Sequence, residues 1–145
     1  MAISDLRKAE VFATRGWCPV SWAHHPKEVK DELRRMGLRP MMKMCWRNSQ
    51  LFFLKTNLEG VTYHEGLCMS VLPIPHSWLE YQGRVLDLTL EEPPKILSSA
   101  SYDHMVVTLT LLSTMVHDPI NPEKINSDYD KIWRGGLTYV DGVEE

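Results

Sequence analysis

The chain has 145 residues, one domain's worth of sequence, and its 43% hydrophobic and 24% charged residues are near the average for globular proteins. It carries 16 Lys and Arg against 19 Asp and Glu, a net charge of −3, whereas a nucleic-acid-binding module usually has a basic excess. We therefore expect a single domain over residues 1–145 without a nucleic-acid partner, and the composition excludes a disordered or fibrous chain.

The sequence shows no mark of secretion, of a membrane span or of a metal site. The polar start MAISDLRKAE lacks the apolar core of a signal peptide, and the longest apolar stretch, 105–116, falls short of a membrane span. The three cysteines, Cys18, Cys45 and Cys68, have neither the pairing of a disulfide framework nor the spacing of a zinc site. We expect a cytoplasmic protein with reduced thiols, no membrane contact, no metal and no cofactor.

The first predicted helix follows His25. Pro26 suits the first helical position because its missing N–H would be unpaired there, and Gly37 is a natural C-terminal stop. The basic residues of 30–39 alternate with acidic ones, which fits a solvated helix face better than a nucleic-acid patch. The apolar positions, spaced by four and three residues, form one stripe: Val29, Leu33 and Met36.

The second predicted helix runs from Met42 to Thr56. Its residues are apolar on several faces, a pattern typical of a central helix buried all round. A buried strand is the rival interpretation for 51–54, but the length of the segment favours a helix. Asn57 and Gly60 then end the element.

Strands follow Gly60. The first is predicted over 63–72, the second over 76–82 and the third over 84–89, and the last two alternate between polar and apolar residues. Because Gln82 and Gly83 make a short turn where the second strand meets the third, we expect an antiparallel hairpin.

The last third of the chain is less regular. Two consecutive prolines predict a loop over 91–101, the segment 102–116 fits either a strand or a helix, and 121–133 fits a short helix that ends at Gly135 and Gly136. Helices followed by several strands and then a mixed region predict an α+β fold.

Three residues suggest nucleophilic catalysis: Cys45 near the start of the second helix, His76 at the start of a strand, and Asp87 on the strand paired with it. A thiol attacks carbonyl groups only as the thiolate, which a helix N-terminus and a nearby imidazole both stabilise. A carboxylate then orients the imidazole. A hairpin that turns near Gln82 and Gly83 would place His76 roughly opposite Asp87.

Other residues are candidates for the same site. The backbone N–H of Cys45 is a natural oxyanion donor, and Asn48, one turn further along the helix, is a candidate for a second. Trp46 and Trp78 either line an acyl site or pack in the core, and Glu65 either binds an amine, positions a loop or makes a structural hydrogen bond. Cys18 is a weaker rival nucleophile because Pro19 follows it directly.

Four blocks of the sequence resemble those of small transglutaminase-like proteins within the papain-like cysteine class, which read C-x-x-N-S, Y-x-E-G, H-x-W and D-x-T. The resemblance covers about 45–89, within a motif-bearing part of about 40–90. Ser77 and Leu88 stand where Ala and Pro are common in that group, and these changes leave the triad intact. The blocks are as follows: Cys45-Trp46-Arg47-Asn48-Ser49, Tyr63-His64-Glu65-Gly66, His76-Ser77-Trp78-Leu79-Glu80 and Val85-Leu86-Asp87-Leu88-Thr89.

The resemblance implies a papain-like fold, with a central cysteine-bearing helix packed on an antiparallel sheet that carries His76 and Asp87. It also implies a cysteine-dependent hydrolase or acyltransferase that forms an acyl-thioester on Cys45, with His76 as base and acid. Its substrate would be a protein or peptide, or a small amide or ester. The alternative is a catalytically silent interaction or inhibitor protein on the same scaffold, which binds a protein partner through an exposed apolar or methionine-rich face.

Overall fold

The structure, a computed structural model, describes residues 25–90 and 95–135. The start of the chain and the rival nucleophile Cys18 lie outside these residues, as do 91–94 of the predicted loop and Gly136. The described part contains four helices and four strands in this order: α2 (Lys27–Arg35), α3 (Cys45–Lys55), β1 (Thr62–Met69), β2 (Pro73–Tyr81), β3 (Arg84–Leu86), β4 (Lys95–Tyr102), α4 (His104–Leu111) and α5 (Pro122–Gly135).

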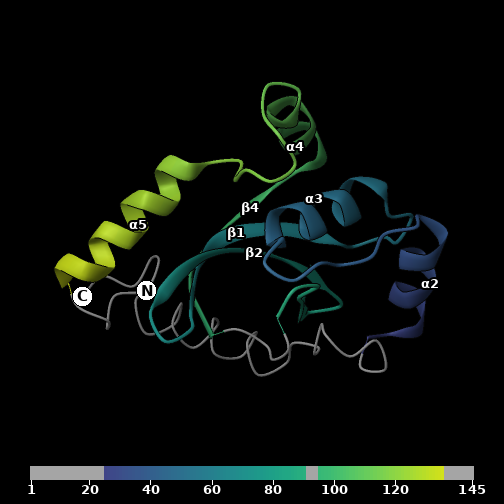
Figure 1. Ribbon diagram of the computed structural model, residues 1–145, viewed down its shortest axis with the longest axis horizontal. Helices are drawn as coiled ribbons and strands as arrows, with labels where there is room; N and C mark the ends of the chain where they lie inside the picture. Colours follow the sequence, from purple (N-terminus) through teal and green to yellow (C-terminus); the bar gives the residue numbers. More distant parts are fainter. Residues whose placement is uncertain (1–24, 91–94, 136–145) are drawn as a thin grey trace.

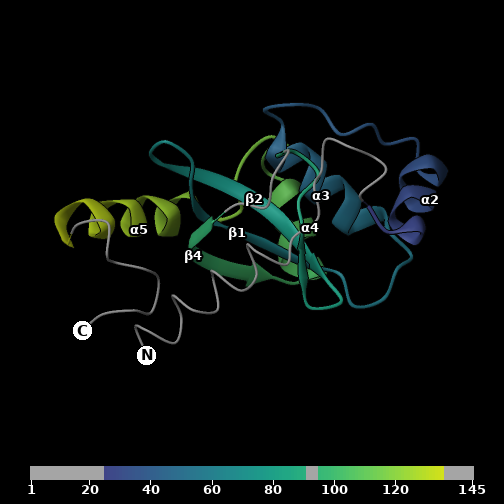
Figure 2. The same cartoon turned by 90° about the horizontal axis from the view of Figure 1, so that it is seen from below.

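The four strands form one antiparallel sheet in the order β3-β2-β1-β4 (Figure 1). Helices α3, α4 and α5 lie on one side of this sheet in Figure 1, and a second view shows α2 and α5 at opposite ends of the molecule (Figure 2). The predicted α+β class is therefore confirmed.

The main core lies between α3 and the sheet. Phe52 and Phe53 of α3 are almost fully buried against Tyr63, Leu79 and Leu86 of the first three strands. Burying each such side chain contributes about 1.5–3 kcal/mol, so this contact fixes α3 on the strand that carries His76. The helix predicted over 42–56 is confirmed, although it begins only at Cys45.

A second cluster joins α5 to the sheet. Ile125 and Ile132 of α5 pack with Leu67 of β1 and Leu97 of β4, and all four are at most 4% exposed. This cluster places α5 beside the N-terminal end of α3, because Trp46 packs against it. The helix predicted over 121–133 is confirmed as α5.

The β2–β3 hairpin has the predicted turn but not the predicted register. Gln82 and Gly83 both have positive φ, 54° and 73°, as a type I′ turn requires. Leu79 pairs with Leu86, so the next step of the ladder brings Asp87 level with Trp78 and not with His76. The expectation that His76 and Asp87 lie roughly opposite one another therefore holds only to within two residues, because the two are diagonal neighbours in the ladder.

The loop predicted over 91–101 is also wrong for its described part, since 95–102 form the edge strand β4. The serines of this strand are typical of a loop, but here Ser98 accepts a hydrogen bond from the Leu67 N–H of β1, and Gly66 allows the two strands to approach closely. A Cβ on Gly66 would lie 2.0 Å from the Ser98 carbonyl oxygen, so the pairing of β4 with β1 depends on glycine at this position.

Of the ambiguous segment 102–116, Tyr102 ends β4, whereas residues 104–111 form the helix α4. Asp103 caps it by accepting a 2.9 Å hydrogen bond from the Val106 N–H, which explains why the β-branched residues here do not form a strand. In the part of the chain that the structure describes, no helix is both long enough and apolar enough to cross a membrane.

Candidate active site

Cys45 is the first residue of α3, and the local backbone makes this helix end electropositive. Lys43, two residues earlier, has a φ of 63°. The N-cap residue Met44 makes no side-chain cap, and the first turn of α3 contains no acidic residue. The N–H groups of a first turn have no acceptor within their helix, so the field at the half-buried Cys45 sulfur favours an anion.

His76 and Asp87 form a buried charge-assisted hydrogen bond. The His76 Nε2–H donates to Asp87 Oδ2 over 2.6 Å, and the two side chains are 3% and 0% exposed. Because Nε2 is occupied by the carboxylate, Nδ1 is the ring nitrogen left to face another group. The structure therefore brings the sequence-predicted histidine and carboxylate together despite the difference in register.

Asp87 is itself held by the backbone that follows it. Its Oδ1 accepts from the N–H groups of Thr89 and Leu90, at 2.8 and 2.9 Å. The carboxylate therefore has one oxygen fixed by two backbone donors and the other directed at His76. This arrangement sets the plane of the imidazole ring before any substrate arrives.

The charge state of His76 follows from three neighbouring influences. Burial alone lowers the pKa of His76, but the Asp87 carboxylate and the Cys45 sulfur outweigh this effect and raise the pKa to about 10. The effect of Cys45 on this pKa relates all three residues to one another, whereas the hydrogen bond itself joins His76 to Asp87. A raised pKa favours the cationic imidazole, the form that stabilises a thiolate.

Asn48 connects the cysteine helix to the aspartate loop. It is fully buried, and its Nδ2 donates to the Met41 carbonyl over 2.8 Å and to Thr89 Oγ1 over 3.0 Å, while its Oδ1 accepts from the Met41 N–H. Both amide hydrogens are therefore used within the protein. Asn48 has the geometry of a strut between α3 and the segment after Asp87, which leaves the Cys45 N–H as the candidate oxyanion donor at this helix end.

The two tryptophans occupy different positions. Trp78 is 1% exposed, and its ring is nearly parallel to that of His76, with 6.1 Å between centroids. On the other side it stacks on His64 at 6.0 Å. Trp46 is half-buried and packs against the α5 cluster beside Cys45. Trp78 thus supports the imidazole from within the protein, whereas Trp46 adjoins the nucleophile at the surface.

The side chain of Glu65 is buried, and its hydrogen bonds are made to Tyr63 and to the loop before α5. It is 1% exposed, and it accepts from the Tyr63 hydroxyl over 2.6 Å and from the N–H groups of Ile120 and Asn121. Burial raises the pKa of Glu65, although these three donors act against it. Its geometry is that of a residue which positions the loop between α4 and α5.

One residue near the site, Thr89, was not singled out from the sequence. It receives the Asn48 bond, and its place in the D-x-T block was the available signal. His64, which the sequence suggested for the rim of the site together with Tyr63, stacks on Trp78 instead, where burial lowers its pKa to about 4.

Neither a metal-binding cluster nor a match to a known protein assigns a function to these residues. Within 25–90 and 95–135 there is no group of three or more His, Cys, Asp or Glu residues arranged to hold a metal ion. A hollow lined by 33, 34 and 37–40 contains none of the three central residues. The chain matches no protein-family model, no curated protein and no solved structure. The transglutaminase-like resemblance therefore depends on its four sequence blocks.

Proposed function

We propose that the protein is a cysteine-dependent hydrolase or acyltransferase that acts on an amide or ester through an acyl-thioester on Cys45. The observation that carries this proposal is the connected group of a half-buried thiol at a helix N-terminus, a buried cationic imidazole and a fixed carboxylate. Thiol nucleophiles are activated by this combination of residues. The mixed helix and sheet architecture is compatible with a papain-like arrangement.

In the proposed reaction the Cys45 thiolate attacks the substrate carbonyl carbon, so that a C–S bond forms and the carbonyl oxygen becomes an anion. The N–H groups at the start of α3 stabilise this anion. The intermediate then collapses, the bond from carbon to the leaving nitrogen or oxygen breaks, and His76 gives its proton to the leaving group. Asp87 keeps the ring oriented throughout.

The second half of the reaction regenerates the thiolate. Water or an amine attacks the thioester carbon while neutral His76 accepts its proton, and the C–S bond then breaks. Hydrolysis and acyl transfer share every protein residue in this scheme. They differ only in the molecule that reaches the thioester.

The test is the pH dependence of Cys45 alkylation by iodoacetamide, with the labelled site assigned by mass spectrometry. Because the helix end and the cationic His76 favour the thiolate, we expect labelling to remain fast well below pH 8. The variants His76→Ala and Asp87→Asn should slow it, and Cys45→Ala should abolish it. Labelling of Cys45 that becomes fast only above pH 8 would refute the proposal.

Cys68 is an internal control for the fold of each variant. It is fully buried in β1, and burial raises its pKa, so it should resist iodoacetamide as long as the protein is folded. A His76 variant that labels at both cysteines has unfolded. Asp87→Asn is then the informative variant, because it keeps the shape of the side chain.

A catalytically silent interaction protein is the second candidate, and α4 is the observation that favours it. The helix protrudes from the body of the molecule in Figure 1. Leu109 of α4 is 59% exposed, and Leu112 and Met115, which follow the helix, are 78% and 63% exposed. Exposed apolar areas of this kind often mark protein interfaces. A Cys45 with ordinary alkylation kinetics would favour this second function over the first.

A further inference from the structure

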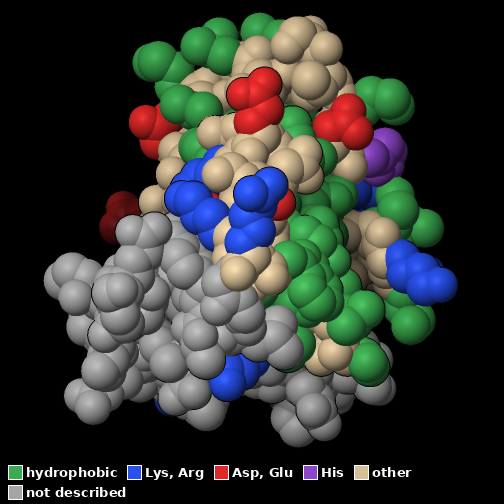
Figure 3. Space-filling view, turned by 90° about the vertical axis from the view of Figure 1, so that its left-hand side faces the viewer, with side chains coloured by type: hydrophobic (Ala, Val, Ile, Leu, Met, Phe, Trp, Pro, Cys, Tyr) green, Lys and Arg blue, Asp and Glu red, His purple; other side chains and the backbone are tan. Residues whose placement is uncertain are grey.

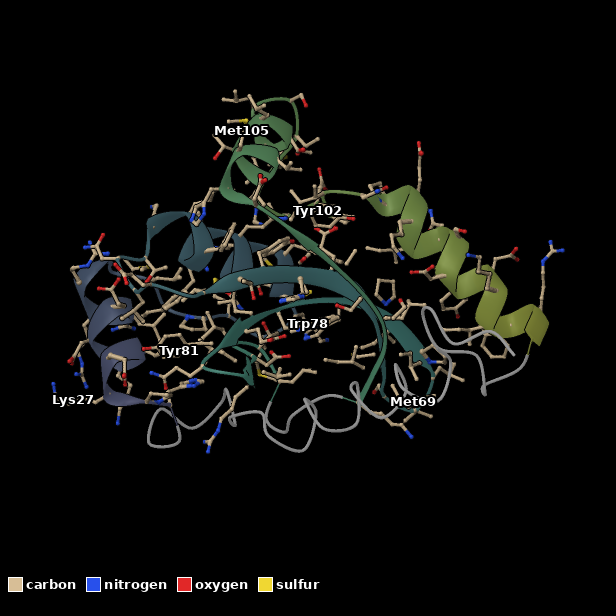
Figure 4. The ribbon with its side chains drawn as sticks, turned by 180° about the vertical axis from the view of Figure 1, so that it is seen from behind. Lys27, Met69, Trp78, Tyr81, Tyr102 and Met105 are labelled. Carbon is tan, nitrogen blue, oxygen red and sulfur yellow. The ribbon has the colours of Figure 1, made fainter. Side chains whose placement is uncertain are left out.

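A hollow lies at the C-terminal end of α2, where arginine and apolar side chains line it together. Its volume is about 590 Å³, within the usual range of about 300–1,000 Å³ for small-molecule pockets. Leu33 and Leu38 are only 1% and 6% exposed and belong to the main core, so part of the lining is apolar and fixed. Figure 4 shows α2, marked by Lys27, at the end of the molecule away from Met69 and α5. The lining residues are as follows: Leu33, Arg34, Gly37, Leu38, Arg39 and Pro40.

Hydrogen bonds hold the segment that lines this hollow. The Leu38 N–H donates to the Leu33 carbonyl over 3.0 Å, a bond typical of a Schellman ending of a helix. The next residue, Arg39, is held through its carbonyl, which accepts from the Arg47 guanidinium over 3.3 Å. The backbone on either side of Arg39 is thus in place before any ligand arrives. A preformed surface loses less conformational entropy on binding, which favours affinity for a small ligand.

The positive charge of Arg39 is not offset by a carboxylate. Within 25–90 and 95–135, no acidic side chain pairs with its exposed guanidinium. Figure 3, which faces the α5 end of the molecule, shows the more common arrangement, with basic and acidic side chains close to one another. Three other arginines form ion pairs, with N···O distances of 3.4, 2.8 and 2.8 Å: Arg34 with Asp31, Arg35 with Glu32, and Arg134 with Asp130.

The end of α2 explains the charge of Arg34 but not that of Arg39. A basic side chain in the last turn of a helix offsets the negative end of the helix dipole, an effect that falls off within that turn. Arg34 lies in the last turn of α2, whereas Arg39 comes four residues after Arg35, where the helix ends. A guanidinium presents its donors in a planar fork that fits a carboxylate or a phosphate group. The hollow therefore combines a donor for an anion with an apolar lining.

We propose that this hollow binds a small organic anion, whose carboxylate or phosphate group is held by Arg39 and whose apolar body lies against Leu33 and Leu38. Arg34 supplies a second guanidinium to the same lining. The volume favours a small molecule, and one uncompensated cation is not the basic stripe that a nucleic acid requires. The inference goes beyond the proposed function and does not depend on the reactivity of Cys45.

The experiment titrates the isotope-labelled full chain with phenyl phosphate, benzoate and inorganic phosphate, and follows the backbone amide signals by NMR. We expect at least one of the two aromatic anions to shift the signals of Gly37, Leu38 and Arg39 until they saturate. Inorganic phosphate should bind at least about tenfold more weakly than that anion, because it has no apolar body to bury. Arg39→Gln should weaken the aromatic anion at least about tenfold, because a charge-assisted hydrogen bond is lost.

Lys43→Gln is the matched control, because it removes one positive charge from an exposed side chain that does not line the hollow, and the affinity should not change. Both substituted side chains are exposed, so both variants should fold, and the amide signals outside the hollow verify this. An equal loss of affinity in the two variants overturns the inference, since the attraction would then be unspecific. Inorganic phosphate that binds as tightly as the aromatic anions also overturns it, as does the absence of saturation by either aromatic anion at about 10 mM.

Discussion

We predict that loss of the hydrogen bond between Asn48 and Thr89 lowers both the stability of the fold and the reactivity of Cys45, two effects that can be measured separately. Thr89→Val keeps the shape of the side chain but removes the oxygen that accepts from Asn48 Nδ2. Asn48 is fully buried, so the freed N–H has no access to water. Leaving a buried donor unpaired costs about 1–3 kcal/mol, and we expect a loss of about that size in the free energy of unfolding.

The same substitution should also slow the thiol. Asp87 keeps its backbone donors and its bond to His76, so the carboxylate and the ring stay paired. What is lost is the link that holds the start of α3 against the aspartate loop, and small misplacements of a nucleophile cost up to about 100-fold in rate. We therefore expect at least about tenfold slower alkylation of Cys45 near pH 6.5.

The matched control lies at the other end of the same helix. Thr56 also uses its hydroxyl, which donates to Glu32 over 2.8 Å, and Thr56→Val should cost a similar amount of stability. It is remote from Cys45 along α3, so the alkylation rate should not change. Urea denaturation and timed iodoacetamide labelling measure the two effects. If Thr89→Val loses stability but reacts as fast as the native chain, the strut has no part in positioning the nucleophile.

Three further predictions concern charge and packing. The raised pKa of His76 stabilises the folded protein fully below the unfolded-state pKa of about 6.5, and this contribution is lost as the pH rises to about 10. The urea concentration at the midpoint of unfolding should therefore fall over this pH range in the native chain, and should fall less in Asp87→Asn. Equal slopes in the two proteins would contradict this prediction. Hydrogen bonds and an ion pair lower the pKa of Glu32 to about 2. Its contribution to folding stability is therefore present above about pH 4.3 and is lost as the pH falls towards 2. In Glu32→Gln the urea midpoint should depend less on pH over this acidic range, and an unchanged dependence would contradict the prediction. Gly66→Ala forces a Cβ onto the Ser98 carbonyl and should cost about 3 kcal/mol or more in urea denaturation, whereas a loss below about 1 kcal/mol would mean that the strands can separate freely.

The sequence predicts the elements whose signals are local. The stripe of α2, the apolar content of α3 and the two-residue turn at Gln82 and Gly83 depend on residues close together in the chain, and each is confirmed. Strand β4 was missed because its serines favour a loop when they are considered alone. It forms because β1 offers an unpaired edge and because Gly66 lets the Ser98 backbone approach, which no local pattern reveals.

In the candidate site, too, the sequence predicts what depends on local signals and misses what depends on residues far apart in the chain. The two-residue turn was enough to predict that His76 and Asp87 would come together, although they are diagonal neighbours and not directly opposite in the ladder. The roles of Asn48 and Glu65 depend on partners 41 and 55 residues away. Such long-range partners are set by the packing of α3 and of the loop before α5, and not by spacing within a motif.

The structure also gives a physical reason for the residues within each block that resembles the transglutaminase-like group. Asn48 ties the cysteine helix to Thr89, and Gly66 admits the neighbouring strand. The histidine and tryptophan of H-x-W stack, because residues two apart on a strand share a face. Each of these contacts would help the scaffold whether or not Cys45 reacts. The blocks alone therefore argue for the fold more strongly than for the chemistry. The buried bond from Asp87 to His76 argues differently. Burying a charged pair is costly, and groups with strongly shifted pKa values are concentrated at functional sites, so this pair supports the proposed chemistry more directly than the sequence blocks do.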